Sequence, residues 1–495
     1  MTQKIELPEL LLPAGSKDKA LTAFLYGADA VYVGVPMFSL RTRENNVTDE
    51  DIVEVLAFAR KNNKKVYVTL NGFPHEFAIE QIKKHLAFLE EIKPDGIIFA
   101  DLGVLSLARE YAPSVPKHLS VQTSTVNIPA MKMWMEMGVE RVILAREMAI
   151  REVAKIHKAL PTLELEYFIH GAVCMAYSGR CLLSNFTGGR DANRGACNHT
   201  CRWNYRVFDE DGRIINVSDH EDHNALETPV TTPEKKTECC GSGKCHDSDS
   251  EQKSSCSSET DGQAKSIREF EKLNFWEEEE RQGEIIPVEE DFHGTHIMSS
   301  KDMCMIEDMQ KIAEAGVCSL KVEGRNKTAY YAATIARAYR KALDNYAAGI
   351  EVDENLWDEI NATANRGFFP GFLNGKPRKG SVKFDANSSK ANKEFAGRVV
   401  GWKDGRLEII VKNKIEAGAK LEVVMPNMSD YFVIIAKDMK FGEKEVDVVH
   451  GGNLNKVVTI DCPTEIEAGI FIRQEAHNPG IKKTPAELAA DSYAA

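Results

Sequence analysis

The sequence has no run of apolar residues as long as a membrane-spanning helix, which needs about 18 residues or more. Its first residues, MTQKIELPELLLPAG, include an acidic residue early and no apolar stretch of signal-peptide length. These absences predict a cytoplasmic protein that does not contact a membrane. Because thiols stay reduced in that compartment, we do not expect the 11 cysteines to form a disulfide framework.

Several motifs of hydrolases and dinucleotide-binding enzymes are also missing. The sequence contains no H-E-x-x-H zinc pair and no G-x-S-x-G nucleophile turn, and no G-x-G-x-x-G follows a predicted strand. These absences disfavour a metallopeptidase, a serine hydrolase and a dinucleotide-binding sheet. A cysteine peptidase that pairs Cys174 with His170 stays an alternative, although a nucleophile seldom needs three more cysteines nearby.

The net charge of -13 looks unsuited to a nucleic-acid partner until it is located. Residues 231–291 carry 17 acidic and 8 basic side chains, so most of the excess lies in one segment. Its stretch TECCGSGKCHDSDSEQKSSCSSETDG has almost no aliphatic residues and is predicted to build no core. A second metal site or incidental cysteines are both compatible with its Cys239, Cys240, Cys245, His246 and Cys256.

Elsewhere in the first 325 residues, short apolar runs alternate with amphipathic helical runs. The expected strands are 9–12, 30–34, 65–70, 96–100, 118–122, 141–145, 163–169 and 319–322. A helical run over 305–315 precedes the last of them. Eight such units predict an α/β fold, a TIM-type (β/α)8 barrel, with an open doubly wound sheet as the alternative.

The chain is predicted to have four parts. Residues 1–206 form the first part of the barrel and carry a cysteine-rich segment, and residues 207–295 hold a hairpin and the partly disordered acidic insert. Residues 296–385 complete the barrel and add a long helix over 328–346. Residues 386–480 alternate strands and turns, which predicts a small C-terminal β-barrel domain.

The active site of a TIM-type barrel forms at the carboxyl ends of its strands. Polar and glycine residues just past each predicted strand are therefore candidates: Gly15, Arg41, Arg43, Asn71, Asp101, Gln122, Thr123, Arg146, Glu147, His170, Glu323 and Arg325.

Four of these candidates are arginines, and guanidinium groups hold carboxylate or phosphate by paired hydrogen bonds. This suits a small dicarboxylate or an RNA backbone. We therefore interpret Arg41, Arg43, Asn71, Gln122, Arg146 and Glu147 as substrate-binding residues, and Glu323, Arg325 and His170 as catalytic candidates. The alternative is that arginines pair with Glu147, Glu323 and Asp101 to close the barrel, and that His170 is hydrogen-bonded within its rim.

The segment 166–201 places Cys174, Cys181, Cys197 and Cys201 within fewer than forty residues. Four thiolates in a reducing compartment indicate a metal centre, and an iron-sulfur cluster needs such a set. Structural zinc is one alternative, but its C-x2-4-C spacing occurs only once here, and buried or redox-active cysteines are the other.

The same segment resembles the collagenase-like peptidase family U32. It reproduces that family's signature E-x-F-x2-G-[SA]-[LIVM]-C-x4-G-x-C-x-[LIVM]-S at Glu166, Phe168, Gly171, Ala172, Val173, Cys174, Gly179, Cys181, Leu183 and Ser184. ELLLPAG, SVQTS, AREM and SLKVEGRNKTAYYAATIARAYRKALD look like the same family, so the resemblance runs from about residue 9 into the C-terminal region. Within the family, the chain is most similar to the proteins that make 5-hydroxyuridine at the wobble position of tRNA.

This resemblance implies an oxygen-independent tRNA hydroxylase with a 4Fe-4S cluster, with prephenate, a dicarboxylate, as co-substrate and an electron-transfer partner. It also implies that the four cysteines are the cluster ligands, although in some relatives the fourth ligand comes later in the chain, so Cys239 or Cys240 could replace Cys201. The small C-terminal domain resembles the second domain of translation factors. A peptidase and a non-catalytic RNA-binding or assembly factor are the alternatives.

Overall fold

The computed structural model describes residues 7–35, 38–39, 47–173, 300–350, 353, 355–375, 391–452 and 457–476, together with the backbone of three strands within 274–296. Two compact units make up the chain. One comprises Met1–Trp203 and Met298–Ala495, and the other comprises Asn204–Ile297. None of the helices within these ranges is long and apolar enough to cross a membrane.

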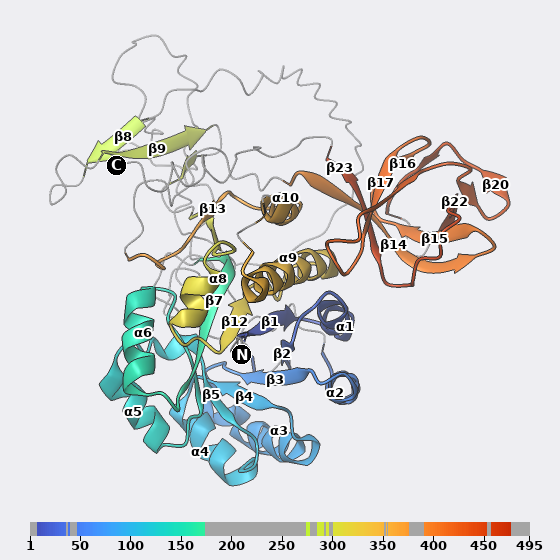
Figure 1. Ribbon diagram of the computed structural model, residues 1–495. Helices are drawn as coiled ribbons and strands as arrows, with labels where there is room; N and C mark the ends of the chain where they lie inside the picture. The colour runs from blue at the N-terminus through green and yellow to red at the C-terminus, as the bar shows by residue number, and fades with distance from the viewer. Residues whose placement is uncertain are drawn as a thin grey trace, which may run out of the picture. The chain divides into compact units, whose positions relative to one another are not determined.

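Eight parallel strands close into a barrel in the first unit (Figure 1). The strands are β1 (Glu9–Ala14), β2 (Ala30–Gly34), β3 (Lys65–Leu70), β4 (Gly96–Phe99), β5 (Lys117–Leu119), β6 (Arg141–Ile143), β7 (Glu164–Ala172) and β12 (Ser319–Val322). Each strand pairs with the next, and β12 pairs with both β1 and β7 to complete the ring. The predicted TIM-type barrel is confirmed, and β12 has the predicted bounds.

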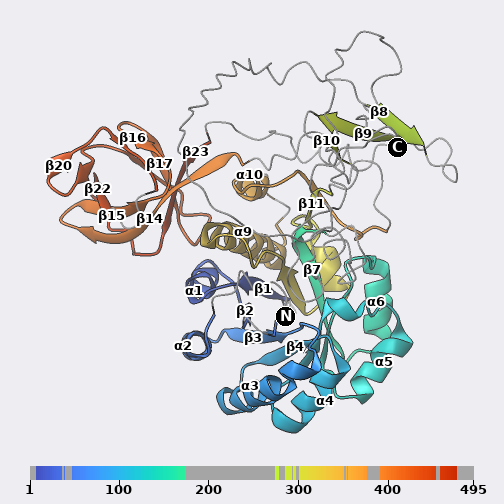
Figure 2. The same cartoon turned by 180° about the vertical axis from the view of Figure 1, so that it is seen from behind.

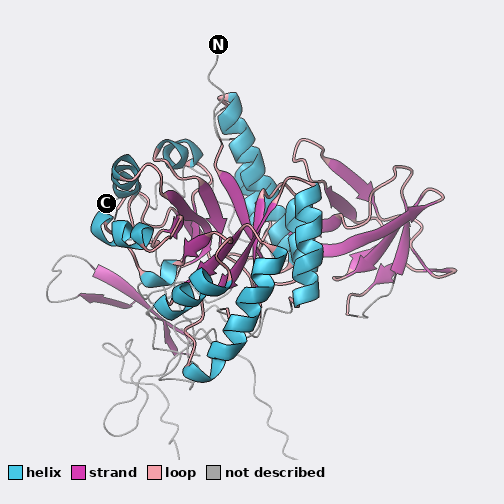
Figure 3. Cartoon of the chain, turned by 90° about the horizontal axis from the view of Figure 1, so that it is seen from below, coloured by secondary structure: helices cyan, strands magenta, loops and turns pink. Residues whose placement is uncertain are grey.

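The barrel helices lie outside the strands, and Figure 3 shows them around the central sheet. They are α1 (Lys17–Leu25), α2 (Asp49–Lys61), α3 (Ile79–Ile92), α4 (Leu102–Tyr111), α5 (Ile128–Glu136), α6 (Ile150–Ala159), α8 (Met309–Glu314) and α9 (Ala329–Ala348), with the short turns η1 (Glu76–Ala78) and η2 (Val121–Thr123). Capping residues close in the sequence stabilise the first turns of several of these helices. Thr48, for example, caps α2 by accepting from the Asp51 backbone, while the Asp51 side chain accepts from the Thr48 backbone.

Strand β7 continues past the ring and pairs with an additional strand. That strand is β11 (Asp302–Cys304), which runs antiparallel to β7 and is flanked by β13 (Phe368–Phe369). The predicted helical run over 305–315 was too long at its start, because the Met305 backbone N–H still donates to the Ile169 carbonyl of β7 at 3.0 Å. The helix itself, α8, begins only at Met309.

The second unit contains three described strands that the sequence did not predict. They are β8 (Asn274–Glu277), β9 (Ile285–Asp291) and β10 (Gly294–His296), in the antiparallel order β10-β9-β8. The hairpin predicted at 203–217 and the cysteine-rich stretch 237–262 lie outside the described residues.

The C-terminal domain is an antiparallel sheet of half-barrel form, which agrees with the expected β fold. Its eight strands have the order β18-β17-β23-β14-β15-β22-β19-β20, and β16 pairs with β21. The bounds are β14 (Lys393–Lys403), β15 (Arg406–Val411), β16 (Ile415–Glu416), β17 (Lys420–Val424), β18 (Phe432–Ile435), β19 (Lys440–Phe441), β20 (Lys444–Glu445), β21 (Val448–Val449), β22 (Val457–Asp461) and β23 (Phe471–Glu475).

The long helix α9, seen from both sides in Figures 1 and 2, lies against α1 and β1 and takes part in a buried ion network. Glu359 of α10 (Asn355–Asn361) binds Arg337 of α9 at 2.5 Å and Arg473 of β23 at 2.7 Å. Burial opposes the charged form of Glu359, but Arg473 and Arg337 outweigh it and lower the pKa of this carboxyl. One carboxylate therefore holds two helices and the C-terminal sheet together.

We expect Glu359→Gln to lower the free energy of unfolding by about 3–5 kcal/mol, because it leaves the buried Arg337 guanidinium without its carboxylate partner and leaves Arg473 paired with Glu422 alone. Chemical denaturation of the full chain measures this. The same substitution at exposed Glu467 is the control. A loss below about 1 kcal/mol would show that the network contributes little more than a surface ion pair.

Candidate active site at the carboxyl end of the barrel

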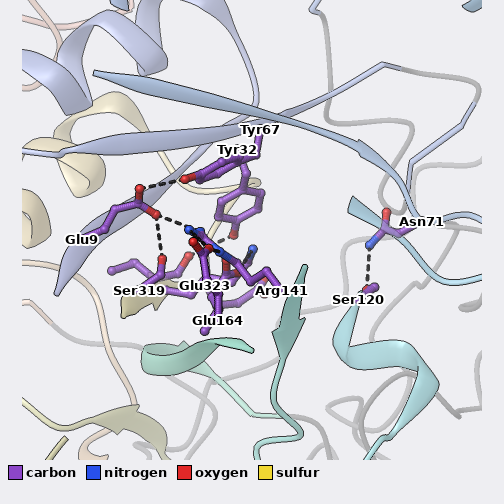
Figure 4. A network of polar contacts seen from close by, with 12 residues as sticks. Glu9, Tyr32, Tyr67, Asn71, Ser120, Arg141, Glu164, Ser319 and Glu323 are labelled. Atoms are coloured by element: carbon purple, nitrogen blue, oxygen red, sulfur yellow. Dashed lines mark hydrogen bonds and ion pairs between the residues drawn. The ribbon is translucent and has the colours of Figure 1, made fainter. Parts of the chain in front are cut away.

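The amino end of the barrel is closed by a buried polar network. Glu9 accepts hydrogen bonds from Tyr67 Oη at 2.7 Å, Ser319 Oγ at 2.9 Å and Arg141 Nη1 at 3.0 Å, as Figure 4 shows. Arg141 also donates to Glu164 at 2.7 Å. Because Glu9, Arg141, Glu164 and Ser319 are the first residues of their strands, this network is structural and leaves the opposite end for chemistry.

A lysine and a glutamate occupy the middle of the barrel. Lys321 donates to Glu166 at 2.6 Å, and its ammonium lies 4.1 Å from the centre of the Tyr32 ring. Burial lowers the pKa of Lys321, against the opposing charge of Glu166. Glu166 is fully buried and is the first residue of the signature described above. In this structure its carboxylate balances the buried positive charge of Lys321.

Arg146 and Glu323 form an ion pair past the ends of β6 and β12. Arg146 Nη2 lies 3.0 Å from Glu323 Oε2, and the guanidinium lies 4.0 Å above the Phe168 ring. Its Nε is buried and has no hydrogen-bond partner among the described residues. The pair bears out one part of the barrel-closing alternative, while the Nε donor of Arg146 is not used within the described residues.

Arg325 follows β12 in the chain and lies beside β2 and β3. Its Nη1 donates to Thr69 Oγ1 at 3.1 Å, and its guanidinium carbon is 5.8 Å from the Tyr32 ring centre. The Lys19 ammonium donates to the Arg325 carbonyl at 3.2 Å. Arg146 and Arg325 thus reach the same end of the barrel from different strands.

Two glycines make the room for this arrangement. A Cβ at Gly34 would lie 2.6 Å from Arg325 Nη1, and one at Gly171 would lie 2.7 Å from the Glu323 carbonyl oxygen. Gly171 also has φ +108°, which a residue with a side chain rarely adopts. The signature glycine therefore allows β7 to pass close to Glu323.

Amide and hydroxyl groups line the side formed by β3 and β5. Asn71 Nδ2 donates to Ser120 Oγ at 3.4 Å, and Ser120 Oγ donates to Gln122 Oε1 at 3.1 Å. Figure 4 shows the Asn71 and Ser120 contact apart from the charged network. All three side chains are buried, so this wall of the site is neutral and polar.

His170 is enclosed and lies away from solvent. The surrounding rings are those of Tyr331, Tyr339 and Phe368, with centroids 5.5 to 6.1 Å away. Its Nδ1 is 3.3 Å from Tyr339 Oη, and burial lowers the pKa of His170 to about 3. This environment favours the interpretation of His170 as a residue of the barrel rim rather than a proton-transfer group.

Of the other predicted residues, Glu147 is half-buried just past β6, and Asp101 caps α4 by accepting from the Val104 backbone. Arg41, Arg43, Cys174, Cys181, Cys197 and Cys201 lie outside the described residues. Their predicted roles stay predictions.

The last described residue before the cysteine segment is Val173, directly past the end of β7. Its carbonyl accepts from Ser300 Oγ at 3.0 Å. Cys304 lies opposite His170 on β11, but burial raises the pKa of its thiol to about 12. Since cluster ligands are thiolates, Cys304 fits this role poorly, whereas the all-cysteine set that follows β7 has the donor chemistry that an iron-sulfur cluster needs.

Sequence reasoning did not identify Lys321, Thr69 or Ser120. It also missed the buried aromatic rings of Tyr32 and Phe168, which contact the Lys321 and Arg146 cations. A signal existed for two of them, because Lys321 and Thr69 are polar residues with apolar residues on both sides in their strands (SLKV and KVYVTL). In a closed barrel such positions face the interior on alternate residues.

Known proteins match the chain along most of its length. The model described as peptidase family U32 matches residues 15–383, and that of the peptidase family U32 C-terminal domain matches residues 391–473. The tRNA hydroxylation protein P of Escherichia coli is 37% identical over 442 residues, which are 88% of this chain and 90% of that protein.

Two further relatives carry other names. A 23S rRNA 5-hydroxycytidine synthase of Escherichia coli is 36% identical over 220 residues, 44% of this chain and 33% of that protein. A collagenase of Porphyromonas gingivalis is 27% identical over 382 residues, 74% of each chain.

The environment of His170 predicts an acid-sensitive stability. Below the unfolded pKa of about 6.5 the unfolded state binds a proton that the native state does not, so stability falls as pH falls toward the folded pKa of about 3. We expect the free energy of unfolding, measured with denaturant, to fall between about pH 7.5 and about pH 5. The fall should be about 2 kcal/mol larger for the native chain than for His170→Phe. The same substitution at exposed His450 is expected to leave this loss unchanged, and equal losses for native chain and His170→Phe would contradict the account.

Proposed function

The chain belongs to peptidase family U32, and from that premise we propose that it hydroxylates uridine to 5-hydroxyuridine at the wobble position of tRNA. Support comes from the near full-length similarity to tRNA hydroxylation proteins, together with two arginines, a glutamate and two carboxamides at one end of the barrel. The relative named as a ribosomal-RNA hydroxycytidine synthase points to the same class of reaction on a pyrimidine of RNA.

In this proposal Arg146 and Arg325 bind an anion. The Nε of Arg146, which has no hydrogen-bond partner among the described residues, is available to donate to a bound anion, and the Tyr32 and Phe168 rings beside the two guanidinium groups suit a planar or ring-containing ligand. We assign them a small dicarboxylate, prephenate by family resemblance, with Arg41 and Arg43 as further contacts. Glu323 pairs with Arg146, and we assign it the roles of orienting that guanidinium and of acting as an acid/base group.

The proposed cofactor is a 4Fe-4S cluster held by Cys174, Cys181, Cys197 and Cys201. Replacing the C5 hydrogen of uridine with a hydroxyl group is a two-electron oxidation, so the reaction requires a redox group. When bound, such a cluster would supply one-electron redox chemistry, and the electron-transfer partner would carry away the two electrons that leave the uridine. Its segment follows β7 in the sequence, and the His170 carbonyl near the end of β7 accepts from the Glu323 backbone N–H at 2.9 Å.

The collagenase relative makes peptide hydrolysis the second candidate. Its nucleophile would be Cys174 with His170 as base. The burial of His170 and its pKa of about 3 make it a poor general base near neutral pH, which favours hydroxylation. A non-catalytic RNA-binding factor would leave uridine unmodified whether or not its arginines are altered.

Nucleoside analysis tests the proposal. In a strain that lacks the gene, the native chain should restore 5-hydroxyuridine in tRNA, whereas Arg146→Met and Arg325→Met should lower the yield at least about tenfold, because each removes a charge-assisted contact. Exposed Arg109→Met is the matched control and should behave as the native chain. Persistence of 5-hydroxyuridine without the gene would refute the proposal.

Metal analysis tests the cofactor. After anaerobic purification we expect about four iron and four sulfide per chain, lost in each of Cys174→Ala, Cys181→Ala, Cys197→Ala and Cys201→Ala. Cys462→Ala, in the C-terminal domain, should keep both. Zinc in place of iron would assign these cysteines to a structural site.

A further inference from the structure

Resting on the proposed function, we infer that the Gln122 carboxamide reads the target base by donating a hydrogen bond to its C4 carbonyl oxygen. Gln122 lies in η2, directly past the carboxyl end of β5, and is 2% exposed. Its Nε2 has no hydrogen-bond partner among the described residues. A buried donor left without an acceptor costs about 1–3 kcal/mol, so a bound ligand that supplies an acceptor recovers that free energy.

The surrounding hydrogen bonds decide which amide atom is free. Ser120 Oγ accepts from the Gln122 backbone N–H at 3.5 Å and from Asn71 Nδ2 at 3.4 Å. Its own proton is therefore directed to Gln122 Oε1, 3.1 Å away. With Oε1 engaged, Nε2 is the remaining group, and it can only donate. The Asn71–Ser120–Gln122 chain thus presents a fixed donor.

The neutral character of this wall favours a base over a carboxylate. Anions at this end of the barrel have Arg146 and Arg325, which come from β6 and β12, whereas the Asn71–Ser120–Gln122 chain contains no charge. A neutral amide donor matches the neutral carbonyl of uracil. Because C4 is bonded to C5, a base held with C5 at the reaction centre presents its C4 substituent to the adjacent wall, while the C2 oxygen lies across the ring.

The same side of the barrel end carries exposed apolar side chains. They follow the neighbouring strands β3, β4 and β5 and are Phe73, Phe77, Leu102 and Val126. Phe77 is 73% exposed, and its ring stacks with that of His75 at a centroid distance of 5.9 Å. Unpaired RNA bases stack on such rings, so this rim suits the nucleotides that flank the target base.

The C4 position separates the two RNA pyrimidines, because uracil has an acceptor oxygen there and cytosine has a donor amino group. A fixed amide donor therefore selects uridine. Gln122→Met keeps the size of the side chain and removes the donor, and Gln122→Glu replaces the donor with an acceptor. The first should abolish the preference, and the second should shift it toward cytidine.

The test uses the purified full chain and anticodon stem-loop RNAs with uridine, cytidine or no base at the wobble position. Fluorescence anisotropy gives the ratio of affinities, and nucleoside analysis gives the products. We expect the native chain to prefer uridine RNA over cytidine RNA by at least about tenfold, and Gln122→Met to bind the two equally. Gln310→Met, on the exposed face of α8, is the matched control and should keep the native ratio.

An unchanged ratio in folded Gln122→Met would overturn the inference. So would a native chain that binds the uridine, cytidine and base-free RNAs alike, or a variant whose loss is confined to prephenate binding. If Gln122→Met does not fold, Ser120→Ala carries the same test, since it removes the hydroxyl that orients the amide. The affinity ratio decides the role of Gln122, whereas 5-hydroxyuridine that persists in the tRNA of a strain without the gene would refute the proposed function instead.

Discussion

Closure of the barrel by β12 is the constraint on which the rest of the structure depends. This strand of four residues pairs with β1 and β7, so that Ser319 lies opposite both Glu9 and Glu166. Along it and just beyond, the chain delivers Ser319 to the amino-end network, Lys321 to the interior, and Glu323 and Arg325 to the carboxyl end. β12, which begins about 150 residues after β7 in the sequence, therefore contributes polar or charged side chains at the amino end, in the interior and at the carboxyl end of the barrel.

The buried charges of the site are held by partners before any ligand arrives. Glu323 fixes Arg146, and Thr69 fixes Arg325. A ligand that meets oriented guanidinium and amide groups loses little free energy to ordering side chains, which is the advantage of a preorganised site. The site has a cationic part and a neutral polar part because different strands supply them. The cations follow β6 and β12, and the neutral donors follow β3 and β5.

The barrel and the positions of many candidate site residues could be predicted from the sequence, because apolar strands and the polar residues that follow them are local signals. Asn71, Gln122, Arg146, Glu323 and Arg325 all lie where that rule places them. The rule could not tell a ligand contact from an internal partner, because the Arg146 and Glu323 pair joins residues 177 positions apart. It also missed β11, whose short DMC sequence becomes a strand only because β7 extends past the ring and offers it an edge.

Cross-linking of RNA to the native chain tests the central claim most directly, namely that the target base enters the carboxyl end of the barrel. An anticodon stem-loop with 4-thiouridine at the wobble position carries its photoreactive sulfur at C4, and mass spectrometry identifies the peptide to which it attaches. The account predicts cross-links to peptides that contain Asn71, Gln122 or Arg146. Cross-links confined to the C-terminal domain, with none at the barrel end, would contradict it.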